Sequence, residues 1–256
     1  MRFGVLTRLA PLKSALWAAM FLCCVACTAA AKDVVVGFGN RLPPYVIPER
    51  NGGITVQIFR EALAYRGHVM KPQFIPLKRM PTMFAMRLLD AAMLDFGIDV
   101  AHEGGFYGEP AIIYENALFT LADRHLRIER PEDMKGLSVL AFQGAQGLYP
   151  AWVEAAVSAG KYNENNNQML QVLELLNGTY DAVLCDRKIF EFFRVQTEMK
   201  YGGTAGRIEE HDVLDKNPDN FRTVFRDENV RNDYEAGLEH LKKTGRYYEI
   251  VRQFGG

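Results

Sequence analysis

The stretch from Gln168 to Phe193, QMLQVLELLNGTYDAVLCDRKIFEFF, changes its hydrophobic period twice and decides the fold class. From Met169 to Leu176 the apolar residues recur at helical spacing, and Asn177-Gly178 supplies the left-handed stop that commonly ends a helix. Tyr180 to Cys185 is a short apolar run typical of a buried strand, and the residues from Arg187 to Arg194 predict the next helix. Helix, strand and helix in this order indicate an α/β fold.

Asp186 stands between this predicted strand and the helix that follows it. In open α/β sheets small ligands bind beside the carboxyl ends of strands, which favours Asp186 as a ligand contact. Asp is also a preferred helix N-cap, where it would hold free backbone N–H groups and nothing else. The residues alone leave both interpretations open.

The chain begins with the features of a secretory signal, which are Arg2, Arg8 and Lys13, an apolar run from Ala15 to Ala26, and a cleavage site at Ala29-Ala30-Ala31. We expect residues 1–31 to be removed and the mature protein to be exported to the periplasm. The alternative is lipid attachment at Cys27, although Cys24 stands where a bacterial lipobox normally has Leu.

Cysteine count, net charge and histidine spacing limit the crosslinks, metals and partners that we expect for this protein. Three of the four cysteines lie in the signal, so Cys185 remains and no internal disulfide is expected. The signal carries three positive charges and no negative one, so its removal takes the formal net charge from −1 to −4. Such a chain lacks the excess of positive charge that nucleic acids or anionic membranes require. The five histidines are scattered, and we expect neither a metal nor a cofactor.

Polar or aromatic side chains follow several other predicted strands. Tyr45 ends the rigid loop Pro43-Pro44-Tyr45 after a strand at residues 34–38, where it can present a flat platform to a ligand or cover the edge of the core. Arg79 lies near the start of a predicted helix at residues 77–89, where its charge gains nothing from the helix dipole. It is either an anion contact or a solvated arginine. The loop Gln143-Gly144-Ala145-Gln146 offers backbone N–H groups that can bind a carboxylate.

The segments between these motifs carry weaker sequence signals of secondary structure. We expect a mobile glycine-rich loop at residues 101–110, a strand at 111–121, a polar connection at 202–220, and two helices from Val230 to Phe254 broken at Gly245.

Dispersed motifs from Val34 to Gly255 occur in a characteristic order. They are Pro43-Pro44-Tyr45, Gly53 before a helix, Asp133 to Val139 (DMKGLSV), the set Gly178, Asp181, Ala182, Val183 and Asp186, and the set Leu241, Gly245 and Ile250. In this order they resemble the bacterial extracellular solute-binding proteins of family 3, the type II periplasmic receptors of ABC amino-acid importers.

The resemblance implies two α/β lobes, each a mostly parallel sheet flanked by helices, joined by two crossing strands. Lobe one would comprise residues 32–116 and 222–256, lobe two residues 122–212, and the hinge residues 117–121 and 213–221.

The resemblance also assigns roles to single positions. The aromatic platform of the family falls on Tyr45 and its ammonium-binding aspartate on Asp186. Its carboxylate-binding arginine falls on Ala101 or His102, and its second-lobe serine or threonine on Ala145, so donors for an α-carboxylate are lost. An ordinary free amino acid is therefore in doubt as the ligand, whereas a solute with an amine or several hydroxyls fits Asp186. The available replacement donors are Arg79, Arg41, His102 and Gln143.

The leading hypothesis is a monomeric binding protein that captures a small polar solute, such as an amino-acid-like compound or an amine, and delivers it to an ABC permease. A ligand-sensing or adaptor module that signals to a membrane sensor is the alternative. A third possibility is a periplasmic dehydratase with His102 and Glu103 or Asp186 as acid and base, but no nucleophile or paired carboxylate motif favours an enzyme.

Overall fold

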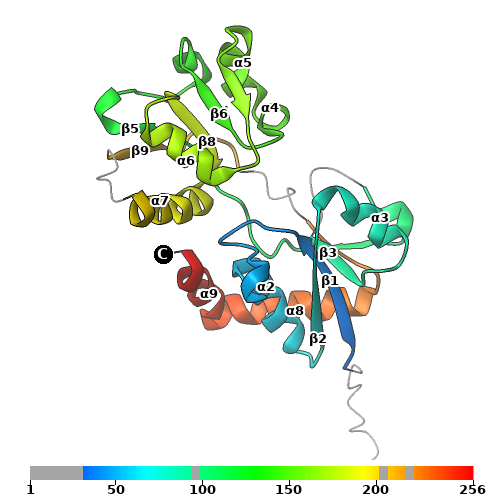
Figure 1. The fold of residues 1–256 in the computed structure, drawn as a ribbon. Helices are drawn as coiled ribbons and strands as arrows, with labels where there is room; N and C mark the ends of the chain where they lie inside the picture. The colour runs from blue at the N-terminus through cyan, green and yellow to red at the C-terminus, as the bar shows by residue number, and fades with distance from the viewer. Residues whose placement is uncertain (1–30, 94–98, 202–206, 217–221, 256) are drawn as a thin grey trace, which may run out of the picture. The chain divides into compact units, whose positions relative to one another are not determined.

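A computed structural model of the chain describes residues 31–93, 99–201, 207–216 and 222–255. The predicted signal peptide up to residue 30, with Cys27, lies outside this range, as does part of the second predicted crossing. The fold consists of two mixed β-sheets flanked by helices (Figure 1). In the described part of the chain, no helix combines the length and apolar character needed to span a membrane.

The first sheet has the strand order β2-β1-β3-β10-β4. Its strands are β1 (Asp33–Gly39), β2 (Val69–Ile75), β3 (Ala91–Met93), β4 (Phe106–Gly108) and β10 (Thr223–Phe225). Strands β1, β2 and β3 are parallel, whereas β10 runs antiparallel to both of its neighbours. The β-branched and aromatic residues Val34, Val36 and Phe38 of β1 are fully buried, as expected for a central strand.

Helices α2 (Ile54–Ala64), α8 (Glu228–Thr244) and α9 (Arg246–Gly255) belong to this first sheet. Aromatic rings join the sheet to the helices, because Phe59 packs edge-on against Phe38, with 5.3 Å between ring centroids, and packs in a tilted arrangement against Tyr234, with 4.7 Å between centroids. At Gly237 a Cβ atom would lie 2.0 Å from the carbonyl oxygen of Ala62, so only glycine allows α8 to approach α2 this closely.

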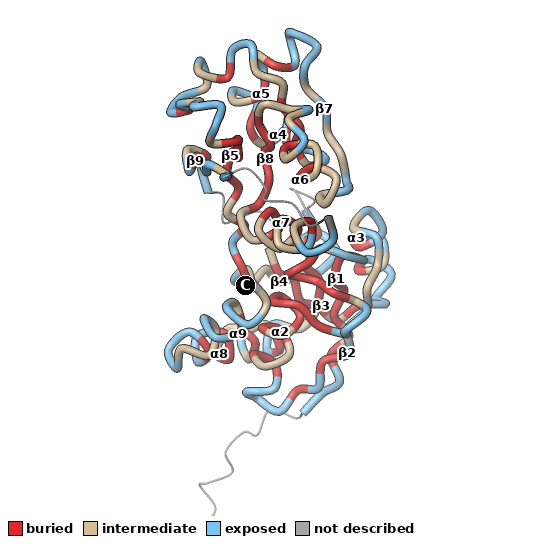
Figure 2. Tube along the Cα trace, turned by 60° about the vertical axis from the view of Figure 1, so that its left-hand side comes forward, coloured by how far each residue is buried: buried red, intermediate tan, exposed pale blue. Residues whose placement is uncertain are grey.

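The second sheet has the order β7-β6-β8-β5-β9. Its strands are β5 (Asn116–Leu121), β6 (Val139–Ala141), β7 (Tyr162–Glu164), β8 (Ala182–Asp186) and β9 (Ile208–His211), and the helices that follow them are α4 (Ala145–Leu148), α5 (Pro150–Ser158), α6 (Gln168–Leu176) and α7 (Arg187–Tyr201). Strand β8 is buried over its whole length, which confirms the prediction made from its apolar run. Figure 2 shows the buried residues concentrated in the strands and the exposed ones in the loops and outer helix faces.

Short elements complete the chain: α3 (Met80–Ala85) and the 3-10 helices η1 (Pro48–Arg50), η2 (Leu77–Arg79), η3 (Ala101–Glu103), η4 (Ala122–Arg124) and η5 (Pro131–Met134).

The structure corrects three sequence predictions. The helix predicted at residues 77–89 is a 3-10 turn followed by the six-residue α3, in which Pro81 occupies the first turn. A proline fits there because the first turn needs no N–H, but it cannot lie inside a longer helix that starts at Leu77. The predicted loop at 101–110 contains η3 and β4, and the predicted connection at 202–220 contains β9.

Strand β9 has the sequence IEEH and no hydrophobic run, and it is a strand because it pairs with β5. Strand β5 includes residues 117–121, which the sequence assigns to the first crossing, and pairs with β8 and β9 of the second sheet. The lobe boundaries themselves stay a prediction.

Candidate functional site

Asp186 is the last residue of β8 and lies directly before α7. One carboxylate oxygen, Oδ1, accepts hydrogen bonds from the backbone N–H groups of Lys188 and Ile189, both at 3.0 Å. These are the contacts of a helix N-cap. The other oxygen, Oδ2, accepts a hydrogen bond of 2.9 Å from the backbone N–H of Glu115. The capping contacts expected at this position are therefore present, together with a bond to the segment that enters β5.

Tyr45 supplies a fourth hydrogen bond to the same carboxylate. Its hydroxyl donates to Oδ1 of Asp186 at 2.8 Å, and only 1% of Tyr45 and 3% of Asp186 are exposed. The Tyr45 ring also packs edge-on against Tyr114, with 4.7 Å between centroids. The structure thus brings together two of the residues that the sequence predicted for the site.

The backbone of Tyr45 is held at the start of α2. Its carbonyl oxygen accepts a hydrogen bond from the N–H of Thr55, and the carbonyl of Pro44 accepts one from Ile54. Gly53 has a φ of +114°, and a Cβ there would lie 2.4 Å from the Tyr45 carbonyl oxygen. The Pro-Pro-Tyr loop and the following glycine therefore act together to fix where the Tyr45 side chain begins.

The environment of Asp186 is unusual for a carboxylate. Burial raises the pKa of Asp186 to about 6, although hydrogen bonds from Ile189, Tyr45, Glu115 and Lys188 oppose the rise. Burial and the neighbouring Asp186 carboxylate raise the pKa of Tyr45 as well, so its hydroxyl stays protonated and donates. No ion pair to Asp186 is found among the described residues. The adjacent Arg187 instead pairs with Glu115, Glu210 and Asp212.

Two residues that the sequence did not single out lie next to this pair. Asn116 is the register partner of Asp186 in the β5–β8 ladder, and its amide donates a hydrogen bond of 3.0 Å to the hydroxyl of Tyr149. Both are nearly buried. Tyr149 precedes Pro150 at the junction of α4 and α5, and this Tyr-Pro junction was the available sequence signal.

The loop from Gln143 to Gln146 does bind a carboxylate, as predicted, but the carboxylate belongs to the chain. Glu164, at the end of β7, accepts hydrogen bonds from the backbone N–H groups of Gly144 at 2.7 Å and Gln146 at 2.9 Å. The Gln143 amide and the Tyr162 hydroxyl donate to it at 3.0 and 2.7 Å. Partial burial raises the pKa of Glu164, but these hydrogen bonds outweigh that effect and hold the pKa below its ordinary value. The donors of the loop are therefore already engaged.

The remaining predicted donors lie on the surface. Arg79 is exposed just before α3. The His102 side chain is 93% exposed and lies 3.9 Å from Asp99, and Arg41 donates to Glu49 at 3.0 Å. Within the described residues, no hydrogen bond or ion pair connects Arg79 or His102 to Tyr45 or Asp186.

Neither a metal site nor a reactive thiol is evident among the described residues. The described residues contain no cluster of three or more His, Cys, Asp or Glu side chains that could hold a metal ion. Cys185 is fully buried, and burial raises its pKa, which makes it an unreactive thiol.

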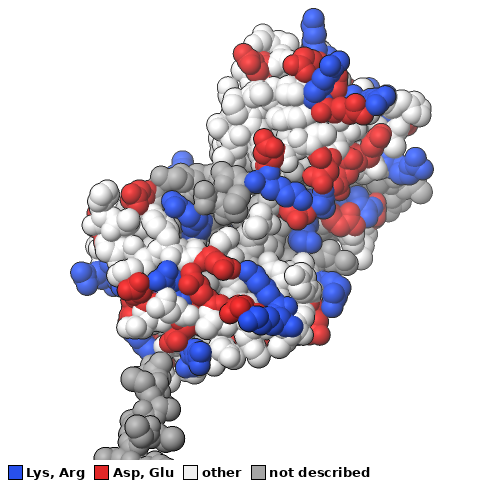
Figure 3. Space-filling view, turned by 180° about the vertical axis from the view of Figure 1, so that it is seen from behind, with Lys and Arg blue, Asp and Glu red and all other residues white. Residues whose placement is uncertain are grey.

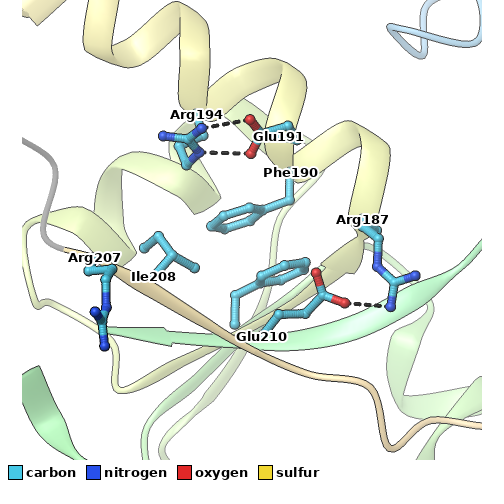
Figure 4. A pocket seen from close by; sticks show the side chains of 8 residues that line it. Arg187, Phe190, Glu191, Arg194, Arg207, Ile208 and Glu210 are labelled. Carbon is cyan, nitrogen blue, oxygen red and sulfur yellow. Dashed lines mark hydrogen bonds and ion pairs between the residues drawn. The ribbon is translucent and has the colours of Figure 1, made fainter. Parts of the chain in front are cut away.

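A pocket of about 630 Å³ lies between α7 and β9, away from the predicted residues (Figure 4). Two of its arginines, Arg194 and Arg187, are already paired. Arg194 binds Glu191 through two hydrogen bonds of 2.7 and 2.6 Å, and Arg187 binds Glu210. The rings of Phe119 and Phe190 stack 3.9 Å apart but are almost completely buried, so they offer little apolar surface. This pocket is therefore a weaker candidate than the surroundings of Asp186.

The surface carries mixed charge. On the face drawn in Figure 3, acidic and basic side chains are interspersed rather than gathered by sign. Many charged side chains of the described residues form ion pairs, for example Arg246 with Glu61 at 2.8 Å.

No family model matches the chain, and no curated protein matches it. Solved structures do. An ancestral arginine-binding protein bound to arginine is 18% identical, with 88% of this chain and 98% of that chain covered and a TM-score of 0.61. A histidine kinase sensor domain with similarity to periplasmic binding proteins is also 18% identical, with coverages of 88% and 96% and a TM-score of 0.63.

An ancestral amino-acid-binding protein described as a precursor of cyclohexadienyl dehydratase is 15% identical, with coverages of 88% and 95% and a TM-score of 0.62. At these identities the comparison establishes the fold. The chain has the two-lobe fold of periplasmic binding proteins, built from two mixed sheets flanked by helices.

Proposed function

We propose that this protein is an exported solute-binding protein that captures a small solute carrying an amine. The observation that carries the proposal is the Asp186 carboxylate, which is buried, bound by three backbone N–H groups, and without a cationic partner among the described residues. A buried carboxylate is strongly stabilised by a cation that binds it with hydrogen bonds. An ammonium group is such a partner.

The hydrogen bonds of the loop after β6 limit which other groups the solute can carry besides an amine. In amino-acid receptors of the resembled family a carboxylate needs its own donors, and here Gly144, Gln146 and Gln143 donate to Glu164. We therefore favour an amine or an amino-acid-like compound whose carboxylate is masked or absent. The structural likeness to an arginine-binding protein supports a nitrogen-rich ligand.

In this proposal Tyr45 and Asp186 form the centre of the site. Arg79 and His102, exposed in this structure, would be outer contacts, and Gln143 is the least favoured because its amide is engaged. The protein would act as a monomer in the periplasm and deliver the solute to an ABC importer.

A sensor module is the second candidate, and the likeness to a histidine kinase sensor domain favours it. It would use the same solute site and differ only in its membrane partner. Turnover is not part of the proposal. Of the residues considered as acid and base, the His102 side chain is 93% exposed and makes no described contact with Asp186.

The test is thermal melting of residues 32–256 against a panel of amines, amino acids, sugars and small acids. A ligand at about 100 times its dissociation constant stabilises the folded state by roughly 2.7 kcal/mol, which raises Tm by about 5 to 11 °C for a chain of this size. We expect amines to give this shift. Asp186→Asn should abolish it, because Asn can still cap α7 but carries no charge.

The matched control is Asp181→Asn, at the other end of β8, where the carboxylate accepts hydrogen bonds from the N–H and hydroxyl of Ser138. This variant should keep the shift. A panel in which no compound raises Tm, or a shift that survives in Asp186→Asn, would contradict the proposal.

A further inference from the structure

The four hydrogen bonds that Asp186 accepts are not equivalent. Three come from backbone N–H groups, of Glu115 before β5 and of Lys188 and Ile189 in the first turn of α7. These donors are fixed, because the β5–β8 ladder and the helix hold the backbone. The fourth comes from the Tyr45 hydroxyl, at the end of a side chain. It is the only one of the four that can leave by a side-chain rotation.

We propose that the Tyr45 hydroxyl is a built-in stand-in for the solute amine, which occupies the exchangeable position on Asp186 until the solute displaces it. The inference rests on the proposed amine-binding function and adds a specificity-determining role for Tyr45. It follows from the burial of the pair, since a carboxylate that is only 3% exposed cannot lose a donor without a large free-energy cost. When no solute is bound, the Tyr45 hydroxyl supplies the donor that the buried carboxylate requires.

To bind Asp186, a ligand must compete with the hydrogen bond that the Tyr45 hydroxyl already donates. A neutral hydroxyl that replaces the Tyr45 hydroxyl exchanges one O–H donor for another and gains little. An ammonium group replaces a neutral donor by a charged one, and it adds a Coulombic attraction to the ionised carboxylate that a hydroxyl does not supply. The stand-in therefore makes the site selective for protonated amines over polyols, although Asp186 by itself could accept a bond from either.

The matched probes are 1,4-diaminobutane and 1,4-butanediol, which have the same length and differ in their end groups. Binding is measured by titration calorimetry on residues 32–256 of the wild type and of Tyr45→Phe. The wild type should bind the diamine and not the diol. Tyr45→Phe removes the competing donor, so the diamine should bind about tenfold more tightly and binding of the diol should become measurable.

Tyr162→Phe is the matched control. It also removes a tyrosine hydroxyl that donates to a carboxylate, at 2.7 Å to Glu164, but it leaves Asp186 untouched. Affinity for the diamine should not change in this variant. Asp186→Asn should abolish binding in both the wild-type and the Tyr45→Phe background.

A measurement on the wild type covers the case in which Tyr45→Phe folds poorly. The hydroxyl proton of Tyr45, held in its buried hydrogen bond, should give a protected NMR resonance that disappears when the diamine saturates the protein. Persistence of that resonance in the saturated protein would overturn the displacement.

The outcomes separate this inference from the function beneath it. If the wild type binds the diamine and Tyr45→Phe binds it equally or less tightly, the stand-in role is wrong while amine binding stands. If the diamine binds to neither protein, both the stand-in role and the amine-binding function are wrong.

Discussion

The hydroxyl of Tyr45 and the carboxylate of Asp186 stand 141 residues apart in the chain and form a buried hydrogen bond of 2.8 Å. Tyr45 follows β1 of the first sheet, and Asp186 ends β8 of the second. The bond therefore joins the parts of the chain that form the two sheets at the residues proposed to bind the solute. The strength of this hydrogen bond depends on whether Asp186 is ionised. We therefore expect both the ligand affinity and the free energy of unfolding to depend on the ionisation of Asp186.

Replacing Asp186 by Ala should destabilise the protein strongly. Three backbone N–H groups and the Tyr45 hydroxyl would lose their acceptor in a buried place, at an expected cost of about 2 to 4 kcal/mol in the free energy of unfolding. Chemical denaturation measures the change. Asp227→Ala is the control, because Asp227 caps α8 through Asn229 at a more exposed position and should cost only about 1 kcal/mol. Equal losses in the two variants would show that Asp186 is a cap and little more.

The stability of the wild type should fall, relative to that of Asp186→Asn, as the pH rises from 4 to 6. The folded-state pKa of Asp186 is about 6, above the ordinary carboxyl value, so over this range the folded protein holds a proton that the unfolded chain has released. The loss should reach roughly 3 kcal/mol and level off above pH 6. Denaturation of both proteins at several pH values provides the test, and parallel pH profiles would contradict it.

Amine affinity should show the opposite pH trend. An ammonium group binds the ionised Asp186 carboxylate, so binding of 1,4-diaminobutane should weaken about tenfold for each pH unit below the pKa of about 6. Calorimetric titration at pH 5, 6 and 7.5 measures this dependence. An affinity that is constant over this range would place the amine elsewhere.

Glu164→Gln should loosen the loop after β6. The carboxylate accepts hydrogen bonds from Gly144, Gln146, Gln143 and Tyr162, and its neutral substitute would weaken them, at a cost of about 1 to 2 kcal/mol in the free energy of unfolding. Because the pKa of Glu164 is lowered in the folded protein, its stabilisation is present above the ordinary carboxyl pKa and is lost as the pH falls through the lowered value. The exposed Glu154→Gln serves as the control and should leave Tm unchanged.

Gly237→Ala should be among the most destabilising single substitutions in the first sheet and its helices. The new Cβ would lie 2.0 Å from the carbonyl oxygen of Ala62, so α8 and α2 would have to separate, at a cost of about 3 kcal/mol or more. Gly147→Ala in α4 is the matched control, because no atom lies within 4 Å of the added Cβ. It should be neutral or slightly stabilising. Similar Tm values for the two variants would refute the close approach of the helices.

The sequence by itself determined several of the regular elements and the order in which they follow one another. The β-branched run after Asp33, the 3.6-residue period of α2 and α6, the apolar run of β8 and the break at Gly245 each correspond to an observed element. These features could be predicted because a hydrophobic period is local: it depends on residues only a few positions apart. The same local signal failed for β9, since a polar edge strand becomes a strand only through its partner.

Only the tertiary structure decided which polar groups meet. In the structure the Tyr45 hydroxyl donates a hydrogen bond to Asp186, and the loop that begins at Gln143 binds the carboxylate of Glu164. Arg79 and His102 remain exposed. The sequence could name these residues as candidates, but it could not pair them, because burial and hydrogen bonding between distant segments depend on how the sheets and loops come together in space. That packing turned Asp186 from one capping aspartate among several into a buried carboxylate with a single exchangeable donor.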